Sequence, residues 1–506
     1  MEASTLLAQG FFPKELPPSF TTRGLSVFFE EIGAFDPQPG PGDKYLKTRL
    51  AVHNLARPGG RRRRLHIPNP FSYYKLCRLL ENGSETLEKH FAKSHFSVSI
   101  PVPDSSDLRA LVPRVDGGQL SLERAKIRSA ARFTLRTDIS RFYSSIYTHS
   151  IPWALEGKTA AKRKRSGGLG NDLDAAFREL QDGQTFGIPI GPDASFVTAE
   201  VIACAVDREL SSRGLAGMRF MDDYELVFDS RSDAEAGLAV VEEVLSDFEL
   251  AINPRKTSID QLPVELDRQW NAEIKSYPFN EDRPITSAEL VNYFNRVFQL
   301  KALYPSDAVL AYAVARLRSV TVDDWDLLQS LICQCALAEP GAMEHVVGLL
   351  QENSNSGLTE AIDGLIQSTI SYHAPLSHGS EVAWALWAAI WFKRSIPTKV
   401  ARALSNGDSA VAILAMHARE LGLIKKSVGL TEWAMPINST SLYSPEWLFA
   451  YEADRQGWIP AATKSKFVQN DPNFSQLKNF DVSFYDPDIS APTKSLLRAE
   501  EFEFYV

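Results

Sequence analysis

The sequence contains few cysteines, no long apolar run and no excess of positive charge. Four cysteines in 506 residues offer no disulfide framework, and no apolar segment follows Met1, so we expect a protein of the reducing cytosol. No uncharged apolar run reaches the roughly 18 residues that a membrane span requires, so no membrane partner is expected. The net charge of −9 argues against a surface coated with basic residues, although it is compatible with a local basic channel.

The composition is otherwise that of a globular protein. Hydrophobic residues make up 44% of the chain and charged residues 23%, which is typical of soluble domains. The length predicts about three domains, or two large ones.

Two adjacent acids, Asp222 and Asp223, lie between two short apolar runs, Met218–Met221 and Tyr224–Phe228. This pattern predicts a strand, a tight turn and a second strand, with the acids at the hairpin tip. Like-charge repulsion between the carboxylates is expected to be offset by a cation. Mg²⁺ suits carboxylate oxygens best, with Mn²⁺ as an alternative. An acid pair in a turn is also common on solvated surfaces, so the pair alone does not define a site.

A third acid strengthens the prediction. Asp138 lies where the alternation of Phe133 and Leu135 ends and a helical pattern with Phe142 and Ile146 begins, so it is expected at the end of a strand. An acid in that position can face a hairpin tip on the neighbouring strand. Three carboxylates from two strands make a site for two metal ions, as nucleotidyl transfer requires.

Four motifs in order resemble the palm of a reverse transcriptase. They are Asp138 with the aromatic Tyr143 five residues later, the loop Gly187–Gly191, the segment Phe220–Asp223, and Leu250–Thr257. The resemblance implies that Asp138, Asp222 and Asp223 hold the metal ions together with the backbone carbonyl of Ile139, and that Lys256 donates a proton to departing pyrophosphate. A surface lysine at a turn is the alternative for Lys256.

The same resemblance assigns residues to the nucleotide. Tyr143 matches the aromatic gate that favours deoxynucleotides, and the loop glycines Gly187 and Gly191, with Pro189 between them, would lie against the nucleotide or base pair. A cluster of arginines around Gly59 and Gly60 can contact phosphates, and within it the family pattern for triphosphate binding falls on Arg63. A solvated basic loop is the alternative for each arginine.

Three further segments are similar to the bacterial abortive-infection (Abi) group of reverse-transcriptase-like proteins. They are the proline- and aromatic-rich start 11–22, Tyr147–Leu155, and the helical half with Glu381–Trp387. The resemblance implies a cytoplasmic, bacterial or prophage-encoded phage-defence enzyme that assembles as a homo-oligomer. It would make single-stranded DNA from deoxynucleoside triphosphates without a template, priming from a tyrosine that stays attached to the product. Tyr45 is the candidate primer, with Tyr73 and Tyr74 as alternatives.

These observations predict an α+β reverse-transcriptase fingers and palm followed by an all-α, HEAT-like helical repeat domain in place of a thumb. The boundaries are 1–40 for an N-terminal arm that prolines keep from forming one helix, 41–285 for fingers and palm, and 286–506 for the helical domain. Trp384, Trp387 and Trp391 are expected in the core. Two rival functions remain: a templated RNA-directed DNA polymerase, and an inactive polymerase-fold scaffold or sensor.

Smaller features carry expectations of their own. His149 is either a catalytic acid or a structural histidine at a helix end, and 161–170 is a basic loop that can contact nucleic acid. Asn171 or Asp172 is expected to cap one helix, and Asp193 another. An amphipathic helix between Arg231 and Leu250 is expected to back the sheet.

Overall fold

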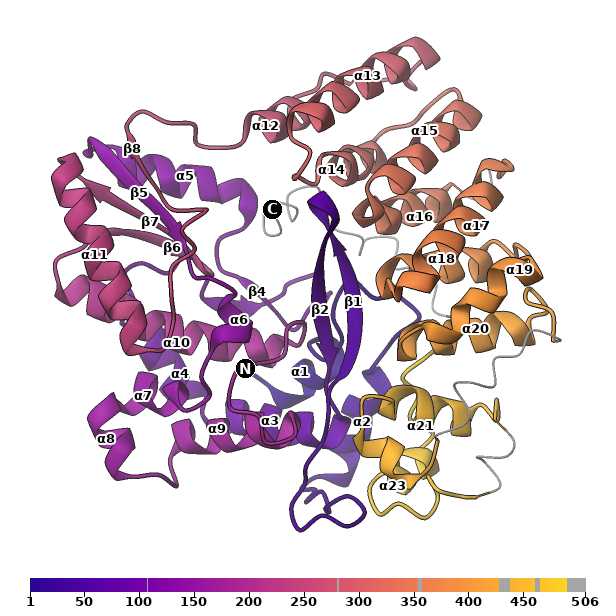
Figure 1. The fold of residues 1–506 in the computed structure, drawn as a ribbon, viewed down its shortest axis with the longest axis horizontal. Coiled ribbons are helices and arrows are strands. Elements are labelled where there is room, and N and C mark those ends of the chain that lie inside the picture. Colours follow the sequence, from indigo (N-terminus) through magenta and orange to yellow (C-terminus); the bar gives the residue numbers. More distant parts are fainter. Residues whose placement is uncertain (107, 280–281, 354–356, 427–436, 460–464, 489–506) are drawn as a thin grey trace.

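The computed structural model describes residues 1–506 except 107, 280–281, 354–356, 427–436, 460–464 and 489–506. The protein is helix-rich α+β: a four-stranded sheet and an array of helices lie on either side of a long β-hairpin (Figure 1). In the part of the chain that is described, no helix is both long enough and apolar enough to cross a membrane. All four cysteines are buried and free.

The four-stranded sheet is antiparallel, with strand order β6-β7-β5-β8. Its strands are β5 (Phe133–Asp138), β6 (Gly217–Phe220), β7 (Asp223–Phe228) and β8 (Ser258–Gln261). Helix α11 (Arg231–Asp247) packs against β5, β7 and β8, and it also contacts α10 (Asp193–Ser212). The predicted amphipathic helix behind the sheet is therefore confirmed. Helix α10 is apolar over most of its length and is buried from Asp193 to Asp207 apart from Phe196.

The N-terminal arm forms two helices, α1 (Ala3–Gln9) and α2 (Arg23–Ile32), separated by the proline-containing segment. The prediction that prolines prevent a single helix is confirmed. The arm packs through aromatics: the ring of Phe11 lies edge-on to Tyr73 and Trp447. Phe20 forms an antiparallel bridge with Tyr485. The two ends of the described chain therefore lie side by side.

The segment between the arm and the sheet contains the long hairpin and several helices. The hairpin pairs β1 (Ala51–Arg57) with β2 (Arg61–Ile67) around Gly59 and Gly60, both at positive φ. The other elements are α3 (Pro70–Asn82), α4 (Ser84–Phe91), β3 (Pro101–Pro103), β4 (Leu111–Pro113) and α5 (Gly117–Arg128). Between β5 and β6, and after β8, lie α6 (Phe142–Ser145), α7 (Ser150–Glu156), α8 (Lys158–Arg163), α9 (Leu169–Leu180) and α12 (Gln269–Lys275).

The C-terminal half is an array of helices in two rows. Helices α14, α16, α18, α20 and α21 contact one another in that order, and α13, α15, α17 and α19 form the second row. Their bounds are α13 (Ser287–Leu303), α14 (Val309–Arg316), α15 (Trp325–Ala338), α16 (Met343–Glu352), α17 (Ala361–His373), α18 (Gly379–Trp391), α19 (Thr398–Ala401), α20 (Ser409–Glu420), α21 (Trp447–Arg455) and α23 (Phe474–Asn479). Trp384 and Trp387 are buried, as predicted for core residues.

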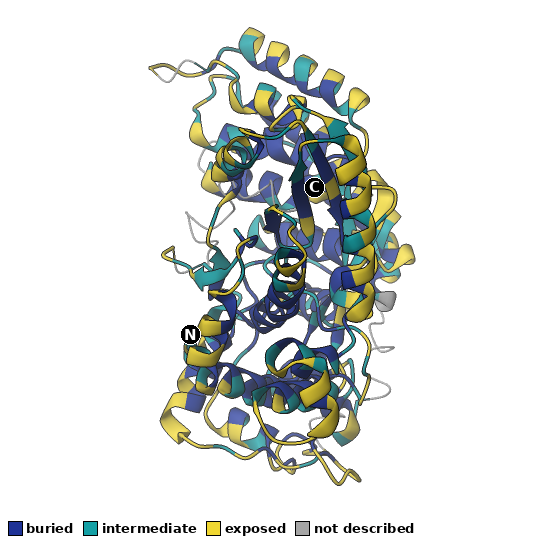
Figure 2. Cartoon of the chain, turned by 90° about the vertical axis from the view of Figure 1, so that its left-hand side faces the viewer, coloured by how far each residue is buried: buried dark blue, intermediate teal, exposed yellow. Residues whose placement is uncertain are grey.

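The two halves share a core. Buried residues run through the interior of both (Figure 2), and one continuous hydrophobic cluster includes residues from Ala3 to Tyr485. The hairpin takes part in this packing, because β1 contacts α18 and α20. The sequence boundary at residues 285 and 286 falls between α12 and α13, and the packing continues across it.

Several local predictions are wrong. Helix α9 begins after Gly168, and the Asn171 amide instead donates to the carbonyls of Lys164 and Gly167. The Asp193 carboxylate does not cap α10, because it accepts from the N–H groups of Ala110 and Leu111. Asn171 thus bonds to the turn just before α9, whereas Asp193 bonds to a distant segment.

After α21 the chain forms the short helix α23, which precedes the segment that pairs with Phe20.

Candidate functional site

Three carboxylates meet at one end of the sheet. Asp138, the last residue of β5, is paired across the ladder with Asp223, the first residue of β7. Met221 and Asp222 form the two-residue turn between β6 and β7, and Met221 has a φ of +52°. The N–H of Ile139 donates to the carbonyl of Asp222 at 3.0 Å, which fixes the turn against β5. The expected hairpin and strand end are present, and they bring the three acids together.

The surroundings of these carboxylates fit a divalent ion. Burial and repulsion from Asp138 raise the pKa of Asp222, and burial and repulsion from Asp222 raise the pKa of Asp223 to about 7. Oδ1 of Asp138 is buried and has no hydrogen-bond partner among the described residues. A buried acceptor without a donor is destabilising, and Mg²⁺ or Mn²⁺ takes such oxygens. Asp223 still reaches solvent, so an ion has access.

The segment 250–257 brings Lys256 to the same place. The N–H of Ser140 donates to the carbonyl of Ala251 at 2.8 Å, and the N–H of Asn253 donates to the carbonyl of Asp138 at 2.8 Å. These bonds hold the segment along the strand end, and the Lys256 ammonium lies 2.7 Å from Oδ2 of Asp138. Burial alone would lower the pKa of Lys256, but the Asp223 and Asp138 carboxylates hold it above its ordinary value. Its role as a proton donor stays a prediction.

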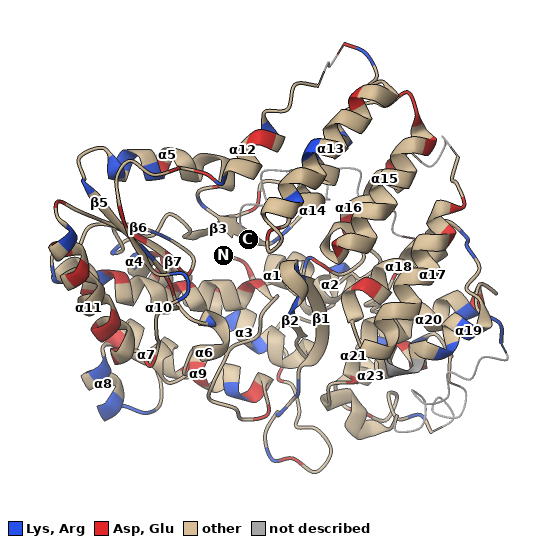
Figure 3. Ribbon diagram, turned by 45° about the horizontal axis from the view of Figure 1, so that its top comes forward, with Lys and Arg blue, Asp and Glu red and all other residues tan. Residues whose placement is uncertain are grey.

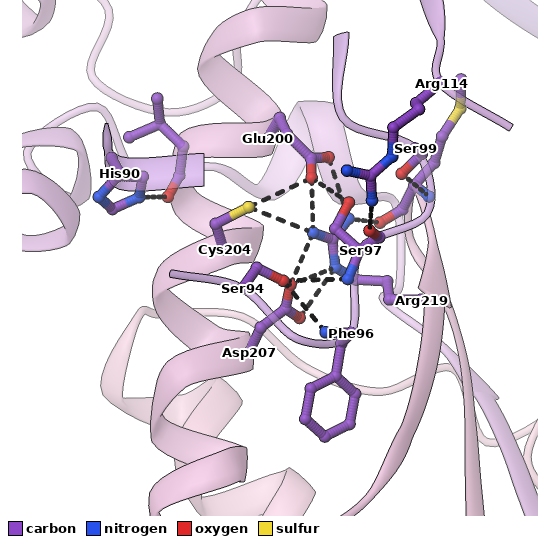
Figure 4. Close-up of polar contacts among 12 residues, drawn as sticks. His90, Ser94, Phe96, Ser97, Ser99, Arg114, Glu200, Cys204, Asp207 and Arg219 are labelled. Carbon is purple, nitrogen blue, oxygen red and sulfur yellow. Dashed lines mark hydrogen bonds and ion pairs between the residues drawn. The ribbon is translucent and has the colours of Figure 1, made fainter. Parts of the chain in front are cut away.

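A buried arginine supports the hairpin from behind, and the sequence analysis did not find it. Arg219, on β6, is fully buried and forms ion pairs with Glu200 at 2.7 Å and with Asp207 at 2.8 Å (Figure 4). Both acids come from α10. The Arg219 guanidinium also donates to the carbonyl of Met221 at 2.8 Å. The turn that carries Asp222 is thereby tied to α10 through one side chain.

Further polar groups complete this network. The N–H of Met221 donates to Oγ of Ser99 at 2.7 Å, Ser97 donates to Glu200, and the Tyr224 hydroxyl donates to Asp207 at 2.8 Å. A signal for the network exists in the sequence. Glu200 and Asp207 are two turns apart on an otherwise apolar helix, so they share one face and require a buried cation.

The loop before α10 docks on the short helix that carries Tyr143. The N–H of Gly187 donates to the carbonyl of Ile146, and the N–H of Ile188 donates to the carbonyl of Tyr143, both at 2.8 Å. Gly187 has a φ of +81°, and a Cβ there would lie 3.3 Å from the carbonyl oxygen of Ser144. Tyr143 is half-buried. Backbone contacts therefore fix the predicted gate and loop relative to each other, while their contact with a nucleotide stays a prediction.

Two other loop residues have structural contacts. Pro189 is buried, so any effect on a nucleotide acts through the shape of the loop. Gly191 has a φ of +127°, and a Cβ there would lie 2.7 Å from Cγ of Pro13. The N-terminal arm therefore packs directly on this loop.

The arginines of the long hairpin have different partners. Arg63, on β2, is near enough to the acid cluster for its charge to lower the pKa of Asp222 against the larger effect of burial. Arg62 instead forms a two-pronged ion pair with Glu381 of α18. The cluster is thus divided: Arg63 is on the side of the carboxylates, and Arg62 joins the hairpin to the helical array.

The three tyrosines considered as primers differ in exposure. Tyr45 is 75% exposed, whereas Tyr73 and Tyr74 are buried. The hydroxyl of Tyr73 donates to the carbonyl of Gly10, and the ring of Tyr74 stacks on Phe29. The segment that contains Tyr45 lies at the lower edge of Figure 1, away from the tip of the β6–β7 hairpin.

The remaining sequence candidates lie outside the acid cluster. Nδ1 of His149 is 2.8 Å from Asp174 of α9, which fits a structural histidine at the start of α7. The segment 161–170, predicted as a loop, is a loop only in its middle, because 161–163 belong to α8 and 169–170 to α9. The exposed basic residues lie on α8 and in the turn after it (Figure 3).

Comparisons with known proteins give a limited result. No protein-family model and no curated protein matches the chain. Among solved structures, a truncated apo telomerase from Candida tropicalis is 9% identical with a TM-score of 0.30, covering 47% of this chain and 54% of that one. Telomerase from Candida albicans, in complex with a fragment of telomeric RNA, is 11% identical with a TM-score of 0.29, covering 82% and 68%.

An apo telomerase from Candida tropicalis is 8% identical with a TM-score of 0.32, covering 90% of this chain and 71% of that one. This chain thus spans about half the length of the truncated enzyme and about two thirds of the other two. Similarity at these TM-scores does not establish a common fold, so the site rests on this chain's own sheet, hairpin and carboxylates.

Proposed function

We propose that the protein is a metal-dependent DNA polymerase of reverse-transcriptase type. The observation that carries the proposal is the pairing of Asp138 with Asp223 across the ladder, with Asp222 in the turn beside them. Oδ1 of Asp138 is buried and has no hydrogen-bond partner among the described residues. Three carboxylates with such an oxygen suit the divalent ions of nucleotidyl transfer. Mg²⁺, when bound, supplies positive charge for the phosphoryl group.

The reaction joins a primer hydroxyl to a deoxynucleoside triphosphate. The hydroxyl releases its proton to solvent, and its oxygen forms a bond to the α-phosphorus while the bond from that phosphorus to the oxygen bridging to the β-phosphorus breaks, so that pyrophosphate leaves. Arg63 contacts the triphosphate as a cation, and Tyr143 disfavours a ribose 2′-hydroxyl. Lys256 donates a proton to the leaving pyrophosphate.

We further propose that synthesis needs no template and is primed by the Tyr45 hydroxyl, so that single-stranded DNA stays attached to the protein. The exposure of Tyr45, compared with the burial of Tyr73 and Tyr74, supports this choice. The similarity of Tyr147–Leu155 to the Abi group supports a role in abortive infection against phage and assembly as a homo-oligomer. A primer far from its own site is compatible with delivery by a second subunit.

A labelling experiment tests the proposal. Purified protein is incubated with Mg²⁺ and each labelled deoxynucleotide, without template or primer, and analysed on a denaturing gel. We expect label that migrates with the protein and is lost in Asp222→Asn. Asp229→Asn is the matched control, because Asp229 is an exposed acid just beyond β7. Tyr45→Phe should remove the label, whereas Tyr372→Phe, at a tyrosine that is 68% exposed on α17, should not.

Other outcomes would select a rival function. Incorporation only with an added primer and an RNA template would favour a templated RNA-directed polymerase. No incorporation under either condition, with equal behaviour of wild type and Asp222→Asn, would favour a scaffold or sensor. Label that survives in Tyr45→Phe would retain the polymerase but reject this primer.

A further inference from the structure

A group of three potential metal ligands lies in the helical array, outside the acid cluster. It consists of His373, which ends α17, and His378 and Glu381, at the start of α18. The two Nδ1 atoms are 2.9 Å apart. Oε1 of Glu381 is 3.4 Å from Nδ1 of His373 and 3.6 Å from Nδ1 of His378. All three atoms therefore face one small volume.

The 2.9 Å separation of the two Nδ1 atoms is that of an N–H···N hydrogen bond when no ion is bound, whereas the two distances to Glu381 are too long for hydrogen bonds. Separations of 3.4 and 3.6 Å exceed the usual range for N–H···O bonds. In a tetrahedral zinc site with bonds of about 2.05 Å, neighbouring ligand atoms are about 3.3 Å apart. The mean of the three observed separations agrees with that value.

The triangle of ligand atoms also has the right shape. With sides of 2.9, 3.4 and 3.6 Å, a point about 2.05 Å from all three atoms lies about 0.7 Å off their plane. A tetrahedral centre lies one third of a bond length, also about 0.7 Å, above the plane of three of its ligands. The observed positions of the three atoms therefore contain a point at zinc-bonding distance from all of them.

The surroundings hold the carboxylate in position. Glu381 is buried: Arg62 Nη1 donates to Oε1, the same oxygen that faces the two imidazoles, Arg62 Nη2 donates to Oε2 at 2.9 Å, and Ser380 donates to Oε2 at 2.7 Å. Such outer contacts orient the carboxylates that ligate metals. The imidazoles of His373 and His378 remain 14% and 23% exposed, so solvent can complete the coordination.

We propose that His373, His378 and Glu381 bind one Zn²⁺ ion. Two imidazole nitrogens, one carboxylate oxygen and a solvent ligand are a known tetrahedral zinc donor set. The ion fastens the end of α17 to the start of α18, where Arg62 of the long hairpin is also attached. The site is independent of the proposed polymerase activity and of its Mg²⁺.

Metal analysis of the untagged full-length protein tests the site. After removal of metal with a chelator, zinc is titrated back and the bound metal is measured by mass spectrometry. We expect one zinc per chain, and a dissociation constant about tenfold higher or more in His373→Ala and in His378→Ala. His95→Ala is the matched control, because His95 is exposed in the loop between α4 and β3, and this variant should bind zinc like wild type.

Cobalt substitution gives a readout that does not depend on the variants folding. Wild-type protein loaded with Co²⁺ should show the strong visible absorption of a tetrahedral centre, and added zinc should displace it. Binding that is equal in the two histidine variants and wild type, or that is lost in His95→Ala, would overturn the proposal. So would a wild-type protein that binds no zinc, or Co²⁺ with only weak octahedral absorption.

Discussion

Replacing Arg219 with methionine should loosen the hairpin that carries Asp222 and Asp223. Methionine keeps much of the side-chain volume, so the main effect is electrostatic: Glu200 and Asp207 lose their buried cation. Removing one partner of a buried ion pair costs about 3–5 kcal/mol. The carbonyl of Met221 also loses its donor. We therefore expect the local opening free energy of β6 and β7 to fall by about 3 kcal/mol or more.

Hydrogen exchange measured by mass spectrometry reports this opening directly. A loss of about 3 kcal/mol corresponds to exchange about 100-fold faster in peptides that cover residues 217–228. Peptides from α18 should change far less, because they lie in the other half of the chain. Arg231→Met is the matched control: Arg231 forms only an exposed pair with Glu235, which is worth about 1 kcal/mol at most.

A combined variant separates charge from packing. If the unpaired carboxylates cause the loss, adding Glu200→Gln and Asp207→Asn to Arg219→Met should restore most of the protection, because neutral groups no longer need a cation. Exchange in the triple variant as fast as in Arg219→Met would refute the electrostatic reasoning. It would mean that the shape of the guanidinium, or its bond to the Met221 carbonyl, carries the effect.

Three further outcomes are expected. Burial raises the pKa of Glu452 to about 7, so above about pH 4.5 the folded chain holds a proton that the unfolded chain has released, and stability falls as pH rises through that window. Glu452→Gln should therefore raise Tm at pH 8 and much less at pH 5, while Glu420→Gln, at an exposed residue, should leave Tm unchanged at both. Gly191→Ala should lower Tm more than Gly33→Ala. Both glycines have positive φ, but of the two positions only 191 has another residue within 4 Å of an added Cβ. Equal losses of Tm would show that backbone strain alone matters. Without Mg²⁺, Asp223→Asn should raise Tm, because it relieves the repulsion of Asp223 by Asp222 and Asp138. Added Mg²⁺ should raise the Tm of wild type more than that of this variant. An equal increase in both proteins would contradict the ion site.

The sequence predicted the acid cluster because local patterns encode it. Apolar residues at alternate positions, Phe133 and Leu135, mark the strand β5 that ends at Asp138, and two short apolar runs mark the hairpin around Asp222. The all-α character of the C-terminal half was also predicted, since its apolar period is local. The caps were not, because Asn171 bonds to the turn before α9 and Asp193 to a segment 83 residues away.

Contacts between distant segments could not be predicted in this way. Arg62 pairs with Glu381, 319 residues away, and nothing in either segment specifies the other. The proposed zinc ligands are close in sequence, and His378 and Glu381 have the i, i+3 spacing of helical neighbours, but His373 joins them only through the break between α17 and α18. The exposure of Tyr45 and the burial of Tyr73 also depend on how the N-terminal arm packs.

The charges on the two sides of the hairpin differ in a way that bears on function. Behind it, the acids Glu200 and Asp207 have the buried cation Arg219 between them, with hydroxyl donors around. At its tip, three carboxylates have Lys256 as a direct ion-pair partner among the described residues, and that pair involves only Asp138. Asp222 and Asp223 therefore have no ion-pair partner among the described residues, and repulsion and burial raise their pKa values, a cost that the proposed divalent ion would offset. The paired charges beneath the hairpin would hold the carboxylates in place for that ion, as the proposed polymerase activity requires.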